Sequence, residues 1–558
     1  MQTPVTMRCL VTVLLVVLVT AAIGQESVGG TPFSKRHGWS FNNVPLLGTV
    51  GLDAAQVAIE DDQRAAEGSL PLYGRILPVS IAPLTDGQWT PLPNGDRVWR
   101  TAIESPGALA TELFFEDFAL PAGAVLHVYS PTTEELLGGF TSYNNHSSGQ
   151  FTTAQIMGPR SIVEYYEPAV VTGQGHFVIT GVGHAYRFVG AAKADACEVD
   201  VECPEGNAWE QERDGVVRIS VVEPGGLGWC SGSLVNNTAL DCKPFFLTAL
   251  HCGLNSTDAN FNNYKFYFRY QRSGCGTGVA LANKVMTGCA RRADSNCGGA
   301  TNGSDFLLVE ANNQVPANFF PYFNGWDASG GTSTAGVCVH HPAGDEKKIS
   351  TYSSNLLSGT WWNASGAHWR VTWVATTNGW GVTEGGSSGS PIFNQNHRIV
   401  GTLTGGGSCC TVNGCGNGTG PTVQDYFGKM SYHWGAQNPN PANEELHVWL
   451  DPTNSGATTL DGTYNPCGIY SVEENAGAGL FLLYPNPAHD LINITVQGVV
   501  ELDEVRLIDM SGRLLKLRAV SSRGPVSVDV SDLADGAYLV ELRSDGVVQA
   551  VQPVVVQR

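Results

Sequence analysis

Positive charge is scarce in this chain. Lys and Arg make up 31 of its 558 residues, against 51 Asp and Glu, which gives a formal net charge of −20. Nucleic acids and anionic membrane surfaces attract proteins through clustered Lys and Arg. The composition therefore argues against both as partners, and we interpret the acidic balance as a solubility feature.

Long apolar runs are absent beyond the first 24 residues. There, Arg8 precedes the apolar run Cys9–Ile23, and small residues stand at Ala22 and Gly24. This order is typical of a secretory signal and predicts a signal peptide with cleavage near Gly24. A membrane anchor is the weaker interpretation, because the run is short and no stop-transfer charges follow it.

Cysteine is absent from residues 25–193 and from everything after Cys467. Of the 14 cysteines, Cys9 leaves with the signal, and the others lie between Cys197 and Cys467. Export makes them disulfide candidates, and the odd number that remains leaves one without a partner. The sequence thus marks one cross-linked domain between two parts that are not cross-linked.

The rest of the composition predicts a multidomain, largely β chain. A chain of this length exceeds a single core, and only 15% of its residues are charged while 67 are Gly. Short runs rich in β-branched and aromatic residues recur at close spacing, without long helical periods. The domains that we predict are a signal peptide (1–24), an all-β domain (25–193), a β-barrel or sandwich (194–468), a linker (469–479) and a small antiparallel β-sandwich (480–558).

A serine on a glycine-rich turn is the main chemical feature of the middle domain. Residues 384–391 read Glu-Gly-Gly-Ser-Ser-Gly-Ser-Pro, so Ser388 has Gly386 and Gly389 close on either side. Glycines permit the backbone angles of a tight turn and leave room for a reacting carbonyl. Such a string is weak evidence alone, because most Gly/Ser loops are plain turns.

His251 and Asp305, which both precede Ser388 in the chain, are suited to assist it. His251 ends a hydrophobic strand-like run beside Cys252, a position that can hold a general base rigidly. Asp305 directly precedes the apolar run 306–309, so it should be buried and need a donor such as an imidazole N–H.

The order His251, Asp305, Ser388 is that of chymotrypsin-type β-barrel proteases, not that of α/β-hydrolases or subtilisins. We expect Ser388 to attack, His251 to move the proton and Asp305 to hold the imidazole. The N–H groups of Gly386 and Ser388 are the expected oxyanion hole, worth about 3 kcal/mol per donor.

Further motifs surround this candidate triad in a fixed order. They are 197–206 (Cys-Glu-Val-Asp-Val-Glu-Cys-Pro-Glu-Gly), 232–238 (Gly-Ser-Leu-Val-Asn-Asn-Thr), 304–306 (Ser-Asp-Phe), 340–342 (His-His-Pro) and 381–384 (Gly-Val-Thr-Glu). Together they resemble bacterial lysyl endopeptidases, a branch of the trypsin-like serine proteases, from about Cys197 to Gly462. The resemblance implies a chymotrypsin-like double β-barrel.

The resemblance also implies a set of disulfides. The matching positions pair Cys197 with Cys410, Cys203 with Cys275 and Cys230 with Cys252. Because Cys409 adjoins Cys410, the sequence leaves the first pairing open by one residue. Loop length also makes two local pairs plausible, although sequence does not settle connectivity. These are Cys289–Cys297 and Cys409–Cys415, and Cys242, Cys338 and Cys467 likewise lie beyond the family pattern.

Substrate choice is implied by a segment after the serine. The family recognises a basic side chain with an aspartate in an Asp-aromatic-Gly-basic segment, and residues 425–429 (Asp-Tyr-Phe-Gly-Lys) occupy that place. A buried Asp425 carboxylate would select Lys or Arg; the alternative is that it only caps a turn. Lysine-specific members carry a histidine where this chain has Thr404, with a stacking tryptophan that is Trp361 or Trp362 here. Thr404 therefore leaves open whether the enzyme also cuts after Arg.

Activation is expected to differ from that of vertebrate trypsins. Ser387 stands where those enzymes have an aspartate that pairs with the new amino terminus, so this salt bridge is not available. Lys193 lies a few residues before Cys197, where a lysine-directed protease can cut its own chain. We therefore favour a removable pro-domain at residues 25–193 over a binding module; another enzyme as the processing protease stays open.

The C-terminal unit carries its own set of motifs. Residues 484–488 (Tyr-Pro-Asn-Pro-Ala), 509–513 (Asp-Met-Ser-Gly-Arg) and 536–541 (Gly-Ala-Tyr-Leu-Val-Glu) closely resemble the C-terminal sorting domain of type IX secretion substrates. The resemblance implies that the type IX machinery exports the chain through the periplasm to the medium or the outer cell surface. The alternative is a generic β-sandwich binding module.

The sequence thus predicts a secreted serine endopeptidase, a zymogen that acts on proteins and peptides with basic residues and works as a monomer without a cofactor. No metal is expected at His340 and His341, because adjacent residues on a strand point to opposite faces. The competing hypothesis is a catalytically inactive, protease-like adhesion module on the cell surface.

Overall fold

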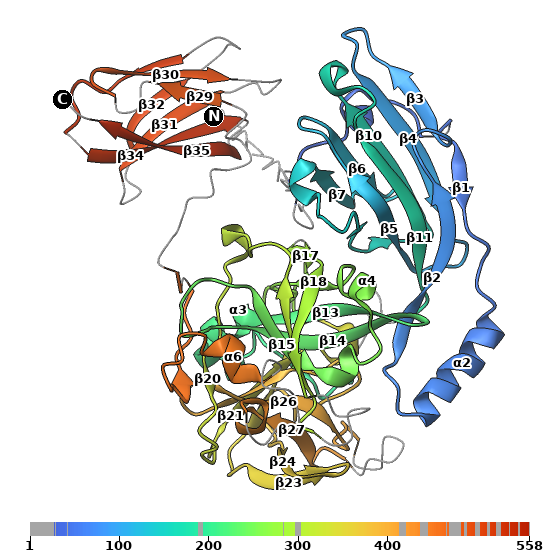
Figure 1. The fold of residues 1–558 in the computed structure, drawn as a ribbon, viewed down its shortest axis with the longest axis vertical. Coiled ribbons are helices and arrows are strands. Elements are labelled where there is room, and N and C mark those ends of the chain that lie inside the picture. The colour runs from blue at the N-terminus through green and yellow to red at the C-terminus, as the bar shows by residue number, and fades with distance from the viewer. Residues whose placement is uncertain are drawn as a thin grey trace, which may run out of the picture.

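The computed structural model is mostly β, as the sequence predicts. It describes residues 27, 29–41, 43–187, 194–282, 284–295, 303–411, 420–435, 445–464 and 466–467, and in the C-terminal unit 481–484, 488–496, 503–509, 514–519, 526–534, 536–544 and 547–556. The predicted processing residues Gly24 and Lys193 lie outside the described residues. Figure 1 shows three folded parts along the chain.

The N-terminal part contains a six-stranded sheet and contributes strands to a larger sheet. The six-stranded sheet is built from β1 (Leu46–Gly48), β3 (Gln88–Pro91), β4 (Arg97–Glu104), β6 (Val125–Tyr129), β7 (Leu136–Phe140) and β10 (Arg160–Glu167). The other strands are β2 (Leu72–Ile81), β5 (Ala110–Ala119), β8 (Phe151–Thr152), β9 (Ile156–Met157) and β11 (His176–Ala185). Their inward aromatic side chains, among them Phe115, Phe118 and Phe177, form the core between the sheets.

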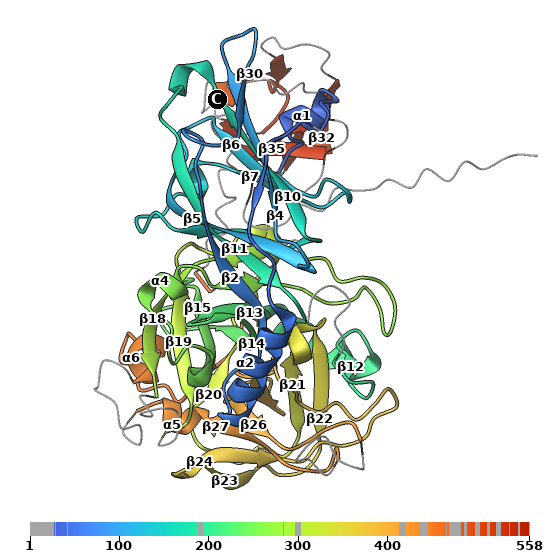
Figure 2. The same ribbon diagram turned by 90° about the vertical axis from the view of Figure 1, so that its right-hand side faces the viewer.

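Two helices in this part, the one-turn α1 (Phe33–Arg36) and the longer α2 (Ala54–Ala66), are not in the predicted all-β pattern. Helix α2 (Ala54–Ala66) begins at Asp53, whose carboxylate accepts the backbone N–H groups of Ala55 and Gln56. Its sequence is rich in alanine and long polar residues, which have high helix propensity, but its weak apolar stripe hides it from pattern reading. Figure 2 shows α2 lying against the middle domain.

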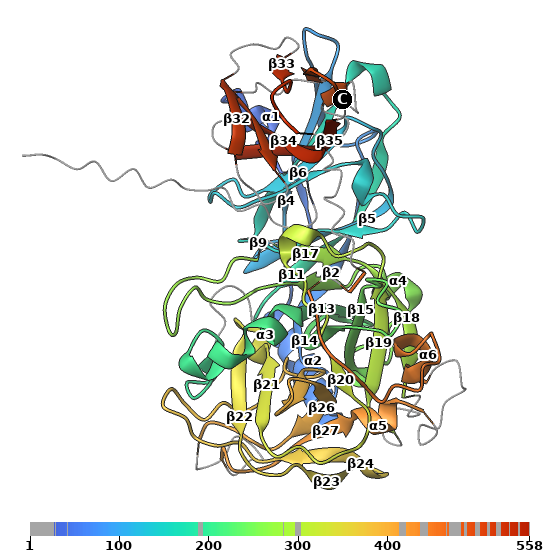
Figure 3. The same cartoon turned by 90° about the vertical axis from the view of Figure 1, so that its left-hand side faces the viewer.

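The middle domain is a double barrel, and Figure 3 shows its two sets of strands stacked on one another. The first barrel contains β13 (Val216–Glu223), β14 (Gly226–Val235), β15 (Phe245–Ala249), β16 (Lys265–Tyr267), β17 (Val285–Thr287), β18 (Cys289–Asp294) and β19 (Phe306–Ala311). Strands β13, β14 and β15 are buried along their whole length on both faces, so they are rich in apolar residues and do not alternate apolar with polar.

The second barrel forms a ten-stranded sheet. Its strands are β12 (Val199–Asp200), β20 (Trp326–Asp327), β21 (Gly336–His340), β22 (Lys348–Tyr352), β23 (Leu357–Trp361), β24 (Ala364–Val371), β25 (Pro391–Asn394), β26 (Ile399–Gly406), β27 (Asp425–Lys429) and β28 (Thr459–Leu460). Short helices flank the barrels: α3 (Glu210–Gly215), α4 (Asp258–Phe261), α5 (Met430–His433) and α6 (Leu446–Leu450). The predicted double β-barrel is confirmed.

The C-terminal unit is a small antiparallel sandwich, as predicted. One sheet contains β29 (Phe481–Tyr484), β30 (Leu491–Val496) and β33 (Val526–Asp529); the other contains β31 (Glu504–Asp509), β32 (Leu514–Ala519), β34 (Gly536–Ser544) and β35 (Val547–Val556). Apolar side chains from both sheets share one core. Among all the residues described, no helix is long and apolar enough to cross a membrane.

The N-terminal part joins the first barrel through a strand pair. Strand β2 lies antiparallel to β14, with Leu227 opposite Gly74 and Gly228 opposite Leu72, so one twelve-stranded sheet runs through both parts. A Cβ on Gly226 would lie 2.3 Å from the Gly74 carbonyl oxygen. The glycines of β14 therefore allow β2 to approach closely.

Candidate active site

The expected base and acid of the triad form a hydrogen-bonded pair. His251 lies in a 3-10 turn, η4 (Leu250–Cys252), directly after β15, and its Nδ1 lies 2.8 Å from Asp305 Oδ2. The other carboxylate oxygen of Asp305 accepts the backbone N–H of His251 at 3.0 Å. The Asp305 side chain is fully buried and that of His251 is 21% exposed, so the carboxylate fixes an imidazole that still reaches solvent.

This carboxylate also determines the proton affinity of the imidazole. Burial by itself lowers the pKa of His251, but the charge of Asp305 and its hydrogen bond outweigh burial. The pKa of His251 is therefore raised above its ordinary value of 6.5. A general base is active only when neutral.

We accordingly expect the acid limb of kcat/KM to have its midpoint above pH 6.5, with activity present above the pKa of His251 and lost as pH falls through it. Replacing Asp305 by Asn should lower the activity and move this midpoint to lower pH, because the charge that raises the pKa is removed. A pH–rate profile on a lysyl peptide amide measures both effects. Asp294→Asn, at a buried acid paired with Arg291, is the control; a midpoint that stays in place in Asp305→Asn contradicts the pairing.

The serine loop is held beside His251 by the first barrel. Ser231 N donates to Ser388 O at 2.8 Å, next to the disulfide that joins Cys230 to Cys252. Gly389 has a φ of +80°, and a Cβ there would lie 2.6 Å from the backbone N of Ala249. Only glycine allows this approach, which brings the half-buried Ser388 against the turn that carries His251.

Three backbone N–H groups of the serine loop have no acceptor among the described residues, and one of them belongs to the exposed Gly385. Ser387 N donates to Glu384 O at 3.0 Å, and Gly389 N donates to Leu403 O at 2.8 Å. The N–H groups of Gly386 and Ser388 have no acceptor among the described residues. Gly386 has a φ of +97°, the left-handed region that favours glycine. These two free N–H groups are where the sequence predicts the oxyanion hole.

Asp425 is fully buried at the start of β27 and accepts four hydrogen bonds. Its Oδ2 accepts the Trp373 indole at 2.6 Å and the hydroxyls of Thr383 at 2.8 Å and Ser408 at 2.6 Å; its Oδ1 accepts Ser408 N at 3.1 Å. Burial raises the pKa of Asp425, and these hydrogen bonds oppose the rise. Thr383 precedes Ser388 by five residues, so one short segment connects this carboxylate to the serine loop.

Of the two candidate tryptophans, Trp361 lies on the strands next to Asp425. Its ring contacts that of Tyr426, with centroids 4.8 Å apart, and a Cβ on Gly405 would lie 3.3 Å from it. Trp362 follows with a φ of +50° and is 46% exposed. Trp361 is therefore the neighbour of the glycine strand end at Gly405.

A histidine that the sequence reading missed contacts Thr404. His368, on β24, places its Nε2 3.2 Å from the Thr404 hydroxyl, and burial lowers the pKa of His368 to about 4. The resemblance to lysine-specific members predicts a histidine on the strand of Thr404, β26. Here the imidazole comes instead from β24, on the other side of β27. No local pattern marks His368, since a single histidine in an apolar strand is most often structural.

His340 contacts the serine loop, whereas the imidazole of His341 contacts the backbone of Asp345. His340 Nδ1 lies 2.7 Å from Ser387 Oγ and its Nε2 lies 3.0 Å from Ser350 Oγ, while His341 Nδ1 lies 3.0 Å from the backbone oxygen of Asp345. Burial lowers the pKa of His340 to about 3, so this imidazole is neutral.

The structure joins the three cysteine pairs that the resemblance implies, Cys197–Cys410, Cys203–Cys275 and Cys230–Cys252. A fourth disulfide, Cys242–Cys467, closes the end of the middle domain onto the loop between β14 and β15. Sequence could not assign it, because 225 residues separate the two cysteines.

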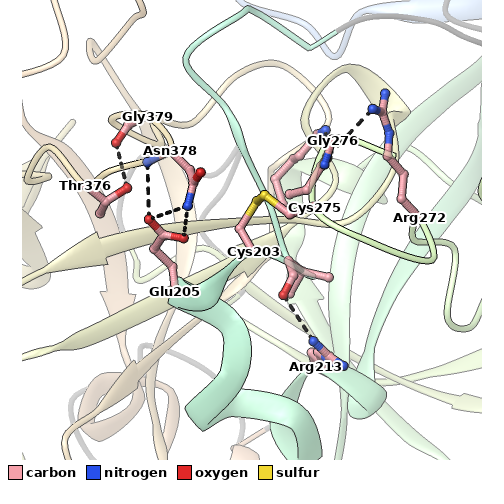
Figure 4. Close-up of a disulfide and its surroundings, with 12 residues drawn as sticks. Cys203, Glu205, Arg213, Arg272, Cys275, Gly276, Thr376, Asn378 and Gly379 are labelled. Carbon is pink, nitrogen blue, oxygen red and sulfur yellow. Dashed lines mark hydrogen bonds and ion pairs between the residues drawn. A yellow bond between two sulfur atoms is a disulfide. The ribbon is translucent and has the colours of Figure 1, made fainter. Parts of the chain in front are cut away.

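Figure 4 shows the Cys203–Cys275 disulfide and its surroundings. Beside it, the Glu205 carboxylate accepts the backbone and side-chain N–H groups of Asn378, and Arg213 Nη1 donates to Val201 O at 3.1 Å. These contacts fix the amino-terminal segment of the middle domain.

Two cysteine predictions need correction or stay open. Cys289 is a buried free thiol on β18, so the local Cys289–Cys297 pair is wrong; its Sγ lies 3.5 Å from Phe261 O. Cys338 is free as well, whereas the odd count predicted a single unpaired cysteine. Cys409 is disulfide-bonded, but Cys297 and Cys415 lie outside the described residues.

Residues of the N-terminal part lie at the serine loop, which sequence reading did not locate. Pro71 Cγ lies 3.6 Å from the position that a Cβ on Gly385 would take, and Leu70 packs on Gly228 of β14. Glu223, whose pKa is raised by burial, feels the charges of both Arg64 of α2 and His251. The segment that links α2 to β2 therefore crosses beside the candidate site.

Two parts of this chain are similar to known protein families. Residues 191–428 match the family described as Lysyl endopeptidase, C-terminal domain, and residues 482–557 match the family described as Secretion system C-terminal sorting domain. A lysyl endopeptidase of Pseudomonas aeruginosa is 26% identical over 433 residues, which cover 72% of this chain and 89% of that protein.

Solved structures that align with part of the chain include other proteases. Protease Anisep from Arthrobacter nicotinovorans is 17% identical and covers 40% of this chain and 92% of its own, with a TM-score of 0.29. A thermostable serine protease, AL20, is 12% identical and covers 39% and 93%, with a TM-score of 0.29.

The middle domain thus makes this chain a serine endopeptidase with a chymotrypsin-like double barrel. More particularly, it is homologous to the lysyl endopeptidases, and the chain also carries the sorting domain of type IX secretion substrates. This tail and the homology identify a protein that is secreted or displayed at the cell surface.

Proposed function

We propose that the chain is the zymogen of an endopeptidase that cuts peptide bonds after Lys, and that His251, Asp305 and Ser388 do the chemistry. Cleavage after Arg is an alternative, because Thr404 stands where lysine-specific members carry a histidine. The single observation that carries this proposal is the buried Asp305 carboxylate bonded to His251, beside a serine loop in which the N–H groups of Gly386 and Ser388 have no acceptor among the described residues. An inactive module has no need of such an arrangement.

The proposed reaction proceeds in two halves. Ser388 Oγ attacks the carbonyl carbon while His251 Nε2 takes the hydroxyl proton of Ser388. The oxyanion that forms accepts hydrogen bonds from the N–H groups of Gly386 and Ser388. His251 returns the proton to the leaving amine as the peptide bond breaks, which leaves an acyl-enzyme. Water then repeats the attack with His251 as base, and Ser388 regains its proton. Asp305 stabilises the imidazolium throughout.

Asp425 is the proposed selector of the basic side chain. Its carboxylate is buried and connected through Thr383 to the serine loop, with Gly406 so close that a Cβ there would meet Asp425 Oδ1. A substrate ammonium or guanidinium would pair with a carboxylate whose other acceptor positions are already filled. Such a site rejects neutral side chains, because they leave the carboxylate buried without a charged partner.

Residues 25–193 are proposed to be a pro-domain that folds with the protease and covers its site. Lys265 of the first barrel and Glu112 of the N-terminal part form an ion pair at 2.7 Å, with both side chains fully buried. Tyr73 stacks on Trp229 and hydrogen-bonds to Ser220. Because β2 is fixed to β14 by these contacts, Pro71 is held at Gly385, where it would obstruct a substrate.

The test is turnover of lysyl and arginyl peptide amides by the processed protein. We expect kcat/KM on lysyl amides to exceed that on matched neutral amides by about 10³-fold or more, in view of the buried carboxylate. The unprocessed chain should be slower, since Pro71 stays in place. Absence of turnover by processed protein with an intact Ser388 contradicts the proposal and favours the adhesion module.

A further inference from the structure

The segment that follows the proposed processing bond donates backbone hydrogen bonds to two carboxylates. Ala194 N donates to Asp345 Oδ2 at 3.0 Å, and Asp195 N donates to Glu384 Oε1 at 2.9 Å. The disulfide between Cys197 and Cys410 anchors the chain just beyond. The backbone nitrogen of Ala194 is therefore already held in place in the uncut chain.

These carboxylates form an acidic cluster, and no Lys, Arg or His among the described residues forms an ion pair with Asp345 or Glu384. Asp345 is 3% exposed, and its Oδ1 has no hydrogen-bond partner within the described part of the chain. Burial, and after it the negative charges of Asp195 and Asp345, raises the pKa of Glu384 to about 7, against hydrogen bonds from Asp195 N and Glu198 that lower it. Glu198, also buried, lies 3.6 Å from His340, whose pKa burial lowers to about 3; the charge of Lys348, which is itself paired with Asp200, also acts on Glu198. A buried carboxylate without a positive partner is costly, so the cluster is suited to receive a cation.

Both carboxylates are attached to the backbone that forms the proposed oxyanion hole. Asp345 follows the turn η6 (Pro342–Gly344), in which Ala343 N donates to Gly385 O at 2.6 Å. Glu384 is bonded to Ser387 twice, since it accepts Ser387 N at 3.0 Å and its own N–H donates to Ser387 Oγ at 3.2 Å. A ligand that joined Asp345 to Glu384 would thus hold the loop of Gly386 and Ser388 from both sides.

We propose that Asp345 and Glu384 form a receptor for the α-ammonium group of Ala194 created when the chain is cut after Lys193. The inference rests on the proposed function for the position of the cut. In that hydrolysis water adds its oxygen to the Lys193 carbonyl carbon, the C–N bond breaks, and the Ala194 nitrogen takes up protons to become an ammonium. The receptor thus takes the place of the aspartate that Ser387 replaces.

The cut changes what Ala194 offers to this cluster. In the uncut chain its nitrogen has one N–H, which is used on Asp345 Oδ2. The ammonium has a positive charge and three donors, enough to satisfy Asp345 Oδ1 and Glu384 as well. Charge-assisted hydrogen bonds of this kind are roughly twice as strong as neutral ones. The oxyanion loop is therefore more firmly held after the cut than before it.

Protection of this amine from cyanate tests the receptor without depending on enzymatic activity. Cyanate adds only to a neutral amine, and an ammonium paired with carboxylates resists deprotonation. The processed full chain is treated with cyanate, and mass spectrometry of the N-terminal peptide measures the carbamylated fraction of Ala194. An added lysine-directed protease makes the cut if the chain does not make it itself.

The expected result is that Ala194 of the processed chain reacts at least about tenfold more slowly than the same amine in a short free peptide, the factor produced by one pKa unit. Asp345→Asn should restore most of the free rate. Glu205→Gln, which removes an acid of the same segment that is bonded to Asn378, should leave the protection unchanged. Insertion of one glycine between Lys193 and Ala194 keeps every side chain and should also abolish protection, so misfolding of Asp345→Asn cannot account for the result.

The outcomes separate this inference from the function on which it rests. An Ala194 amine that reacts at the free-peptide rate, or one whose protection persists in both Asp345→Asn and the glycine insertion, overturns the receptor alone. A mature N-terminus at another residue overturns both the receptor and the proposed processing bond.

Discussion

Replacing Ser388 by alanine should lower kcat/KM on a lysyl peptide amide by about 10⁶-fold, the loss typical of removing the nucleophile of a serine protease triad. In the proposed mechanism His251 and Asp305 activate only this hydroxyl, so the residual rate would come from substrate binding and the oxyanion donors. Burst kinetics with an active ester should lose the acyl-enzyme burst at the same time.

Ser390→Ala is the matched control for this prediction. Ser390 lies on the same loop, but its hydroxyl contacts the buried thiol of Cys338 at 3.2 Å and not the triad. Its activity should stay within about tenfold of the wild type, as for an ordinary loss of one hydrogen bond. If Ser388→Ala retained as much activity as Ser390→Ala, Ser388 would not be the nucleophile.

The same variant bears on maturation. If the chain cuts itself after Lys193, Ser388→Ala should remain uncut, and N-terminal sequencing should find no Ala194 terminus. Persistence of the cut would assign processing to another protease and leave the catalytic role of Ser388 intact.

Replacing Asp425 by Asn should lower kcat/KM on lysyl and arginyl amides by about 10³-fold or more, because the substrate cation then enters a buried site without a counter-charge. Turnover of matched neutral amides should change far less, by about tenfold at most. Asn has nearly the shape of Asp but presents an NH₂ group to donors that now point at a carboxylate, so some loss of stability is expected.

The neutral substrate is therefore also the control for folding in Asp425→Asn. Asp461→Asn removes an exposed acid paired with Arg398 and should leave both substrates unaffected. Equal losses on basic and neutral amides in Asp425→Asn would contradict a role in selection and support the turn-capping alternative.

Sequence order and motif spacing predicted the parts of the site that come from local pattern. The His251, Asp305 and Ser388 positions stand at strand ends and on a glycine turn, and their order in the chain indicates the double barrel that the structure has. The strands of the first barrel were recognisable for the same reason, since runs such as β13 are rich in β-branched apolar residues.

What sequence did not reveal depends on long-range contact. Helix α2 has too weak an apolar stripe to be recognised, and the Cys242–Cys467 bond joins residues far apart in the chain. The pairing of β2 with β14 needs glycines whose purpose is visible only when the partner strand is in place. Asp345 likewise reads as an ordinary turn acid, and only the fold brings Ala194 and Glu384 to it.

The central claim, that this serine endopeptidase selects basic residues through Asp425, is tested most directly by a cleavage-site profile. The processed protein is incubated with a mixed peptide pool and the cut bonds are identified by mass spectrometry. The account predicts that nearly all cuts follow Lys, with Arg the only other residue accepted, and that Asp425→Asn loses this bias. Cuts distributed over neutral or acidic residues would contradict it.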